Sequence, residues 1–284
     1  MVRIIADTLS SLPLSTAEKL NIPMLPQIVI FGDKTFRDDT EMNSKTFLEM
    51  LVSSPALPKT AAPPPALYNP IFEKILSEDD SIIVVCPSAE VSGTVRSAEV
   101  AAKEFPGADI RIFDTRILAG SLGSIVLKAD EWAKAGLNAD QIIKNLQDMS
   151  SRENTYFYVD TLEYLRKGGR IGGAQALLGG ILQVKPILTL RNGRVESLES
   201  QRTKRRALAR INELVNTQAP HDSSAMVSVM HGNAENEANK LREELKISLG
   251  INEIPLYELT PAILTHSGPG ALGVSFFKKE TSYS

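Results

Sequence analysis

Short apolar runs and segments of helical periodicity alternate along the first half of the chain. The runs are VRIIA (2–6), QIVIF (27–31), SIIVVC (81–86) and DIRIF (109–113). The segments with helically spaced apolar residues are 44–52, 65–77, 93–104 and 118–135. Buried strands that alternate with helices form crossover units, in which neighbouring strands run parallel. We therefore predict an α/β domain in which all four runs join a mainly parallel sheet with helices on both faces.

The second half of the chain has a different pattern. Its expected strands are TYFYV (155–159), VKPILTL (184–190), RVESLES (194–200), AMVSVM (225–230) and NEIPLYEL (252–259), and its expected helices are 203–215 and 234–246. Asn192-Gly193 is typical of a two-residue hairpin turn, which makes the strands on either side antiparallel. We predict two α/β domains, 1–153 and 154–284, the second with a mixed sheet.

Charge and cysteine content exclude several classes of protein. A net charge of −3 argues against a general nucleic-acid binder. Cys86 is the only cysteine, so the chain has no internal disulfide and no all-cysteine metal site, as expected for a reducing cytoplasm. The first residues, MVRIIADTLSSLP, fit a first strand better than a signal peptide.

The usual nucleotide and hydrolase motifs are missing from the sequence. GPGALG (268–273) matches the glycine pattern of dinucleotide sites, but too few residues follow Gly273 for the required βαβ unit. The chain also contains neither a phosphate-binding P-loop nor a G-x-S-x-G nucleophile motif. We therefore expect no cofactor and no catalytic residues of a standard type.

The three histidines have no spacing that would form a metal site. His231 is expected at the end of a strand, where a structural role is the common one. His266 lies in the polar, glycine-rich segment THSGPG, and either a structural role or a ligand-binding role is compatible with that setting.

A serine-containing loop follows the predicted strand 81–86. Ser88 and Ser92 lie in this loop, before Gly93-Thr94 and a helix. Ligands bind beyond the carboxyl ends of parallel strands, and helix N-termini favour anions. Serine is also a preferred N-cap residue, so Ser92 could cap the helix, bind an anion, or do both.

Six segments occur in the order found in the DegV family. They are ADTLSSLP (6–13), KTAAPPP (59–65), VSGTVRSA (91–98), DTLEYLRKGGRIGGAQALLGGILQVKPIL (160–188), HGNAENEA (231–238) and HSGPGALGV (266–274). The similarity spans nearly the whole chain, and the segment 160–188 and the HSGPGALG tail are its most specific parts. The chain thus resembles the bacterial DegV-type fatty-acid-binding proteins.

This resemblance implies a cytoplasmic, two-domain carrier without a catalytic cycle, acting in lipid transport or fatty acid metabolism. Its ligand would be a palmitate-like long-chain fatty acid in a tunnel between the domains. The resemblance also implies a partner, the catalytic subunit of a fatty acid kinase, which phosphorylates the bound carboxylate. Transient membrane contact would serve ligand exchange.

Matched residue by residue, the carboxylate ligands would be Thr60, Ser92 and His266. Backbone of the head-group loops would come from Ala61, Gly93 and Thr94, and the tail 260–284 would pack back at the ligand site. One departure concerns the threonine loop. The family continues the threonine as TSQPS, whereas this chain has alanine at 61 and 62, so two polar side chains are missing.

The segment KGGRIGGAQALLGGIL (167–182) places six glycines beside aliphatic residues. Glycine lets backbone approach an acyl chain or an opposing strand closely. We therefore expect the apolar side chains here to line the tunnel, namely Ile171, Leu177, Leu178, Ile181 and Leu182. The alternative is a glycine-rich joint between domains, with the leucines in an ordinary core.

The densest basic stretch is RTKRRALAR (202–210). Such a run is usually the solvated face of a helix, and the alternative is a docking surface for an acidic partner or for a phosphate. The docking candidates are Arg170, Arg202, Arg205 and Arg206. The competing functional hypothesis is an esterase that uses Ser92 with His266, against which the missing nucleophile motif counts.

Overall fold

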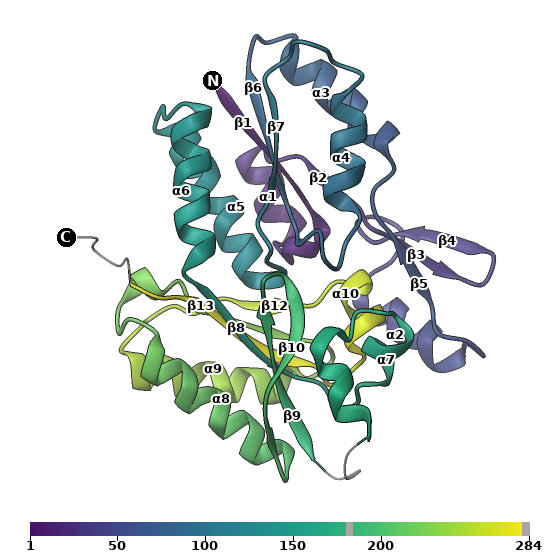
Figure 1. Cartoon of the computed structure of the whole chain (residues 1–284), viewed down its shortest axis with the longest axis vertical. Helices are drawn as coiled ribbons and strands as arrows, with labels where there is room; N and C mark the ends of the chain where they lie inside the picture. Colours follow the sequence, from purple (N-terminus) through teal and green to yellow (C-terminus); the bar gives the residue numbers. More distant parts are fainter. Residues whose placement is uncertain (180–183, 280–284) are drawn as a thin grey trace. The chain divides into compact units, whose positions relative to one another are not determined.

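The computed structural model describes residues 1–179 and 184–279, and the chain divides into two compact units (Figure 1). Unit 1 comprises Met1–Ser151 together with Thr260–Ala262. Unit 2 comprises Arg152–Leu259 together with the chain from Ile263 onward. Each unit has its own sheet and core, and each is described by itself.

Unit 1 is built on a four-stranded parallel sheet, as predicted. The strand order is β2-β1-β6-β7, and every neighbouring pair runs parallel. The strands are β1 (Val2–Asp7), β2 (Met24–Leu25), β6 (Ser81–Cys86) and β7 (Ile110–Asp114). Ile82 and Ile83 are both fully buried although they point to opposite faces, which explains why this strand is a continuous apolar run.

Helices cover both faces of this sheet, as the alternating sequence pattern predicts (Figure 1). On one face, Tyr68 and Phe72 pack with Ile5 and Val84 in a core shared with α3 (Asn69–Leu76) and α4 (Thr94–Ala102). On the other face lie α5 (Ala119–Lys134) and α6 (Ala139–Ser151), each with an apolar side that is fully or nearly fully buried. The remaining helices of unit 1 are α1 (Leu14–Leu20) and α2 (Ser44–Ser53).

The run at 27–31 does not belong to the parallel sheet, so this part of the prediction is wrong. It forms the centre of a separate antiparallel sheet of order β4-β3-β5. These strands are β3 (Ile28–Phe31), β4 (Lys34–Arg37) and β5 (Lys59–Ala61). The physical reason is the Gly32-Asp33 turn, in which Gly32 has a φ of +62° and turns the chain back into a hairpin.

Unit 2 contains the predicted mixed sheet, with six strands in the order β10-β9-β8-β13-β11-β12. The strands are β8 (Glu153–Tyr158), β9 (Lys185–Arg191), β10 (Arg194–Gln201), β11 (Ser228–His231), β12 (Leu256–Glu258) and β13 (Leu272–Phe277). The expected hairpin is confirmed, because Arg191 pairs with Arg194 across Asn192 and Gly193, which both have positive φ. The last strand expected from the sequence, 252–259, is too long, since β12 has only three residues.

The core of unit 2 lies between its sheet and two long helices, α8 (Lys204–Gln218) and α9 (Glu235–Leu249), which cover one face of the sheet (Figure 1). Tyr158 and Val274 of the sheet pack there with Ile211 of α8 and Leu245 of α9. Shorter helical segments are α7 (Glu163–Lys167), a 3₁₀ helix (Gly172–Gly179) and α10 (Pro261–Ser267). No described helix is long and apolar enough to cross a membrane.

Candidate functional site

Polar side chains converge in unit 1 at the carboxyl edge of the parallel sheet. Asp7 is the last residue of β1, and Gln27 follows β2. Ser92 and Thr94 lie beyond the carboxyl end of β6, where α4 begins. The carboxyl ends of parallel strands meet at one edge, which is the usual place for ligands in such sheets. We call these four residues the polar cluster.

Hydrogen bonds join the members of the polar cluster directly. The Thr94 hydroxyl lies 2.9 Å from Oδ2 of Asp7 and 3.0 Å from Oγ of Ser92. Nε2 of Gln27 donates to Oδ2 of Asp7 at 2.8 Å and to Oγ1 of Thr94 at 3.0 Å. The three residues Asp7, Gln27 and Thr94 are each at most 3% exposed, and Ser92 is the half-buried member at the outer end.

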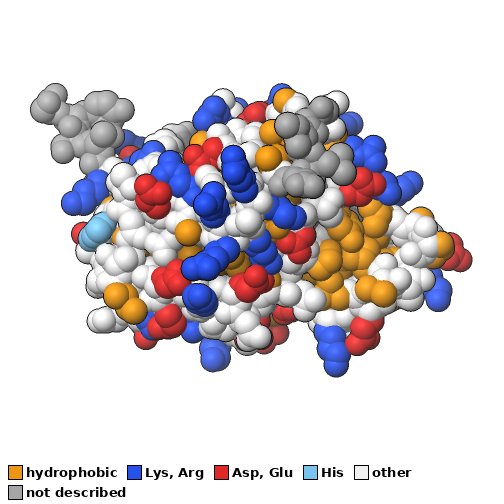
Figure 2. All heavy atoms as spheres, turned by 90° about the horizontal axis from the view of Figure 1, so that it is seen from below, with side chains coloured by type: hydrophobic (Ala, Val, Ile, Leu, Met, Phe, Trp, Pro, Cys, Tyr) orange, Lys and Arg blue, Asp and Glu red, His pale blue; other side chains and the backbone are white. Residues whose placement is uncertain are grey.

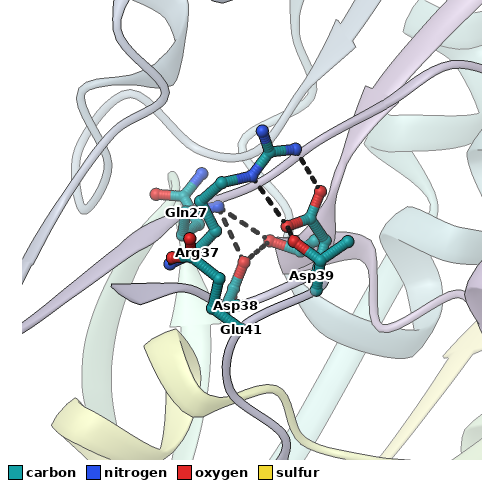
Figure 3. Close-up of polar contacts among 7 residues, drawn as sticks. Gln27, Arg37, Asp38, Asp39 and Glu41 are labelled. Carbon is teal, nitrogen blue, oxygen red and sulfur yellow. Dashed lines mark hydrogen bonds and ion pairs between the residues drawn. The ribbon is translucent and has the colours of Figure 1, made fainter. Parts of the chain in front are cut away.

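A second buried acid, Asp38, lies beside the polar cluster. Its Oδ1 accepts hydrogen bonds from the Thr8 hydroxyl and from the backbone N–H of Gln27, both at 2.8 Å. Figure 3 shows Gln27 next to Asp38, with the Arg37–Asp39 ion pair close by. Burial raises the pKa of Asp38 to about 7. Burial likewise raises the pKa of Asp7 to about 7, with a further contribution from the charge of Asp38. The edge therefore holds two acids that change protonation near neutral pH.

Ser92 contacts both the start of α4 and the polar cluster. The N-cap residue of α4 is Gly93, and Oγ of Ser92 accepts a hydrogen bond from the N–H of Thr94 at 3.3 Å. The backbone N–H of Ser92 donates to the carbonyl oxygen of Ser88 at 3.0 Å, which fixes the turn. The hydroxyl of Ser92 thus satisfies one amide at the helix start and also contacts the polar cluster.

The threonine loop packs against the start of α4. Thr60 is the half-buried middle residue of β5 and pairs with Val29. A Cβ atom at Gly93 would lie 3.4 Å from Cβ of Ala62, and the Ser97 hydroxyl donates to the carbonyl oxygen of Pro63. The loops that carry Thr60 and Ser92 are therefore adjacent within unit 1. Ala61 is exposed, and the small side chain of Ala62 fits directly against Gly93.

His266 lies in unit 2, on α10, in a close contact with the KGGR segment. A Cβ atom at Gly168 would lie within 3.0 Å of the His266 ring, so only glycine leaves room for the imidazole there. Arg170 donates to the carbonyl oxygen of Gly168 at 2.7 Å. Burial, with a smaller contribution from the Arg170 charge, lowers the pKa of His266 to about 4. A neutral imidazole has one N–H donor and one acceptor. The ring of His266 can therefore donate one hydrogen bond to an anion, and Arg170 supplies a positive charge close to it.

The glycine-rich segment makes close backbone contacts with β10. A Cβ atom at Gly172 would lie 3.2 Å from the carbonyl carbon of Val195 and closer still to its oxygen. One at Gly173 would overlap the carboxyl group of Glu196. These two glycines approach an opposing strand, which is one of the two uses that the sequence suggests for them.

The aliphatic residues of that segment differ in exposure. Ile171 is buried, Leu177 is half-buried and Leu178 is 43% exposed. Ile181 and Leu182, which the sequence also suggests as tunnel residues, lie outside the described residues.

The basic stretch divides into paired and exposed cations. Lys204 contacts Glu237 at 2.8 Å, and Arg210 contacts Glu199 at 2.8 Å. The three arginines at 202, 205 and 206 are exposed, and none forms an ion pair within the described parts of the chain. Figure 2 shows Lys and Arg side chains interspersed with Asp and Glu on the face seen from below, where α8 and α9 lie.

His231 and the acidic side chains do not form a further site in the described part of the chain. His231 is the last residue of β11, is buried, and has its pKa lowered by burial. Residues 1–179 and 184–279 contain no group of three or more His, Cys, Asp or Glu side chains that could hold a metal ion.

Sequence reasoning missed three members of this edge: Asp7, Gln27 and Asp38. Asp7 carried a usable signal, because it ends an apolar strand and so lies where ligands bind. Gln27 and Asp38 carried no such signal. They reach the edge only because the small antiparallel sheet folds back, and a local sequence pattern does not show this. Thr94 was expected to contribute backbone, and the structure places its side chain inside the polar cluster.

Comparison with known proteins extends over the whole chain. Residues 1–279 match the family model described as "Uncharacterised protein, DegV family". A DegV domain-containing protein of Streptomyces coelicolor is 37% identical over 275 residues, which covers 96% of this chain and 97% of that protein.

Solved structures agree with this relationship. A DegV family protein from Thermus thermophilus, described as fatty acid binding, is 31% identical with a TM-score of 0.91, covering 98% of this chain and 99% of that one. DegV from Bacillus subtilis, described as a fatty acid binding protein, is 33% identical with a TM-score of 0.86 and the same coverage. With its two α/β units and a match along nearly its entire length, the chain belongs to the DegV family.

Proposed function

We propose that this protein binds a long-chain, palmitate-like fatty acid and presents its carboxylate to a partner kinase. The hydroxyls of Thr60 and Ser92 would donate hydrogen bonds to the carboxylate, with His266 as a third donor. The observation that carries this proposal is the packing of the Thr60 and Ser92 loops against each other at the carboxyl edge of the sheet. The relatives described as fatty acid binding support the ligand class.

The chemistry of the ligand sets what the protein must supply. Removing an acyl chain from water is worth about 0.8 kcal/mol per methylene, so about fourteen methylenes give roughly 11 kcal/mol gross. This gain requires a dry aliphatic enclosure. We assign Ile171, Leu177, Leu178, Ile181 and Leu182 to its lining. The carboxylate needs hydrogen-bond donors, because a buried anion without partners is costly.

The contacts of Ser92 within unit 1 are compatible with a carrier. A serine nucleophile needs a general base within hydrogen-bond reach of its hydroxyl. The side-chain partner of Ser92 in unit 1 is the hydroxyl of Thr94, which is not a base. The chain would then act in the cytoplasm in lipid transport or fatty acid metabolism, without a cofactor, and exchange its ligand through transient membrane contact. Turnover of a generic ester would favour the esterase instead.

The first prediction concerns the ligand itself. Protein purified without detergent is expected to contain a long-chain fatty acid in a stoichiometric amount. The reason is that the free energy of the acyl chain is much lower in an apolar enclosure than in water. Native mass spectrometry followed by denaturing extraction measures this directly. Repeated absence of an acyl ligand, combined with no binding of added palmitate, would contradict the proposal.

The second prediction concerns the exposed arginines at 202 and 206. The double change Arg202→Glu with Arg206→Glu should leave fatty-acid affinity unchanged but reduce phosphate transfer by the kinase several-fold, because an acidic or phosphate-bearing partner would lose two cations. Steady-state kinetics at varied carrier concentration measure the effect. The control is Lys45→Glu with Lys144→Glu, which makes the same charge change at exposed positions of unit 1. Equal kinetics in both double variants would show that the basic stretch is only the solvated face of a helix.

A further inference from the structure

The hydroxyl of Thr94 has three hydrogen-bond neighbours and only one proton. Its Oγ1 lies 2.9 Å from Oδ2 of Asp7, 3.0 Å from Nε2 of Gln27 and 3.0 Å from Oγ of Ser92. The amide nitrogen of Gln27 can only donate, so it always uses an acceptor lone pair of Thr94. The proton of Thr94 therefore goes either to Asp7 or to Ser92, and the protonation of Asp7 decides which.

When Asp7 is ionised, its carboxylate can only accept. Thr94 then donates to Asp7, and Ser92 must donate its own proton to Thr94 to complete the contact. One of the two lone pairs of Ser92 accepts from the N–H of Thr94, which leaves only a lone pair, and no proton, for a ligand. A carboxylate would then meet a lone pair of Ser92 close to the buried negative charge of Asp7.

When Asp7 is protonated on Oδ2, every bond in the chain can reverse. Asp7 donates to Thr94, Thr94 donates to Ser92, and Gln27 keeps both of its donor bonds. Ser92 then accepts from both the hydroxyl and the N–H of Thr94, and its own proton is free for an outside acceptor. The only net change is one proton taken from water onto Asp7.

We infer that the Asp7–Thr94–Ser92 chain couples uptake of one proton by Asp7 to the ability of Ser92 to donate a hydrogen bond to a bound carboxylate. Asp7 is thus a positioning residue, which acts on the ligand through Thr94 and Ser92. This inference rests on the proposed function, because it takes Ser92 as a carboxylate ligand.

The surroundings of Asp7 favour the neutral acid. The titratable groups that interact with it are Asp38, beyond β4, Tyr68, before α3, and Cys86, at the end of β6. Burial raises the pKa values of Tyr68 and Cys86, so both are uncharged at neutral pH, and Asp38 is another acid. None of these groups is a cation that would hold Asp7 ionised. Its pKa of about 7 places the change within the range in which binding can be measured.

The test measures affinity against pH with a probe that does not titrate. A long-chain alkyl sulfonate stays anionic throughout, so any pH dependence of its binding comes from the protein. For a site that needs Asp7 protonated, affinity should fall about tenfold between about pH 6 and about pH 8. Asp7→Asn should lose most of this pH dependence, because residue 7 then has no proton to gain or lose. Thr94→Val, which removes the link but keeps Asp7, should flatten the profile as well.

Asp38→Asn is the matched control, since it removes the neighbouring acid and leaves the chain from Asp7 to Ser92 intact. The charge of Asp38 raises the pKa of Asp7, so this variant should keep the transition and shift it to lower pH. Titration calorimetry with palmitate in two buffers of different ionisation enthalpy should also show proton uptake near about pH 8 in the wild type and none in Asp7→Asn.

The outcomes separate this inference from the proposed function. Tight binding with the same pH profile in wild type, Asp7→Asn and Thr94→Val would overturn the inference and leave fatty-acid binding intact. If neither palmitate nor the sulfonate binds at any pH, the proposed function fails and the inference fails with it. Loss of the pH dependence in both variants, with the shifted transition in Asp38→Asn, would establish the coupling.

Discussion

Replacing Ser92 with Ala is expected to weaken fatty-acid binding about ten- to a hundredfold, because one charge-assisted hydrogen bond to a buried anion is worth about 1.5–3 kcal/mol. Stability of the ligand-free protein should change little. The hydroxyl accepts only one helix N–H, at 3.3 Å, and the N-cap position belongs to Gly93. A residue that acts purely as a cap predicts the reverse, with about 1 kcal/mol lost from stability and affinity almost unchanged.

Paired measurements of thermal unfolding without lipid and of palmitate affinity separate these two cases. The affinity is measured at about pH 6, where Asp7 is mostly protonated and Ser92 can donate to the ligand. Ser10→Ala is a suitable control, because Ser10 is fully buried and donates to the backbone carbonyl of Asp7 at 2.7 Å without contacting Ser92. That variant should lose stability and keep its affinity. Unchanged affinity in both Ser92→Ala and Thr60→Ala would remove the proposed carboxylate site.

The parallel sheet of unit 1 could be predicted because its evidence is local. Strands buried on both faces, such as β6, must be apolar at consecutive positions, and helices between them must repeat their apolar residues with helical spacing. The hairpin at Asn192-Gly193 is local for the same reason, since its two residues need positive φ.

Strand β13 could not be predicted in this way. The segment GPGALG drew attention as a nucleotide motif, yet Leu272–Phe277 is a central strand, paired with β8 on one side and β11 on the other. Gly273 fits there because a Cβ would come within 3.1 Å of Cβ of Phe157. A strand glycine of this kind is dictated by its neighbours in the sheet, and neighbours are not visible in a local pattern.

The polar edge shows the same limit. Thr60 and Ser92 were expected from a family resemblance, and chemistry at a strand end could have suggested Asp7. Gln27 and Asp38 are far from Ser92 in sequence and reach the edge through the hairpin of β3 and β4. Their effect on Asp7 depends on burial and distance, which only the folded chain supplies.

The glycine-rich segment allows one packing contact to be tested against a matched site. Gly172→Ala should lower the free energy of unfolding by about 2–5 kcal/mol, because a positive φ costs a side chain about 1–2 kcal/mol and overpacking typically costs about 1–3 kcal/mol. Gly172 has a φ of +51°, and its added Cβ would meet the backbone of Val195, which cannot move aside as a flexible side chain would.

Gly169→Ala is the control, because Gly169 has a φ of +71° in the same segment and nothing lies within 4 Å of its added Cβ. It should lose only about 1–2 kcal/mol for the backbone conformation. Both changes reduce the freedom of the unfolded chain equally, so urea denaturation of the two ligand-free variants isolates the contact with Val195. Equal losses would show that β10 does not require glycine at 172. The positive φ of Gly172 would then account for the whole loss.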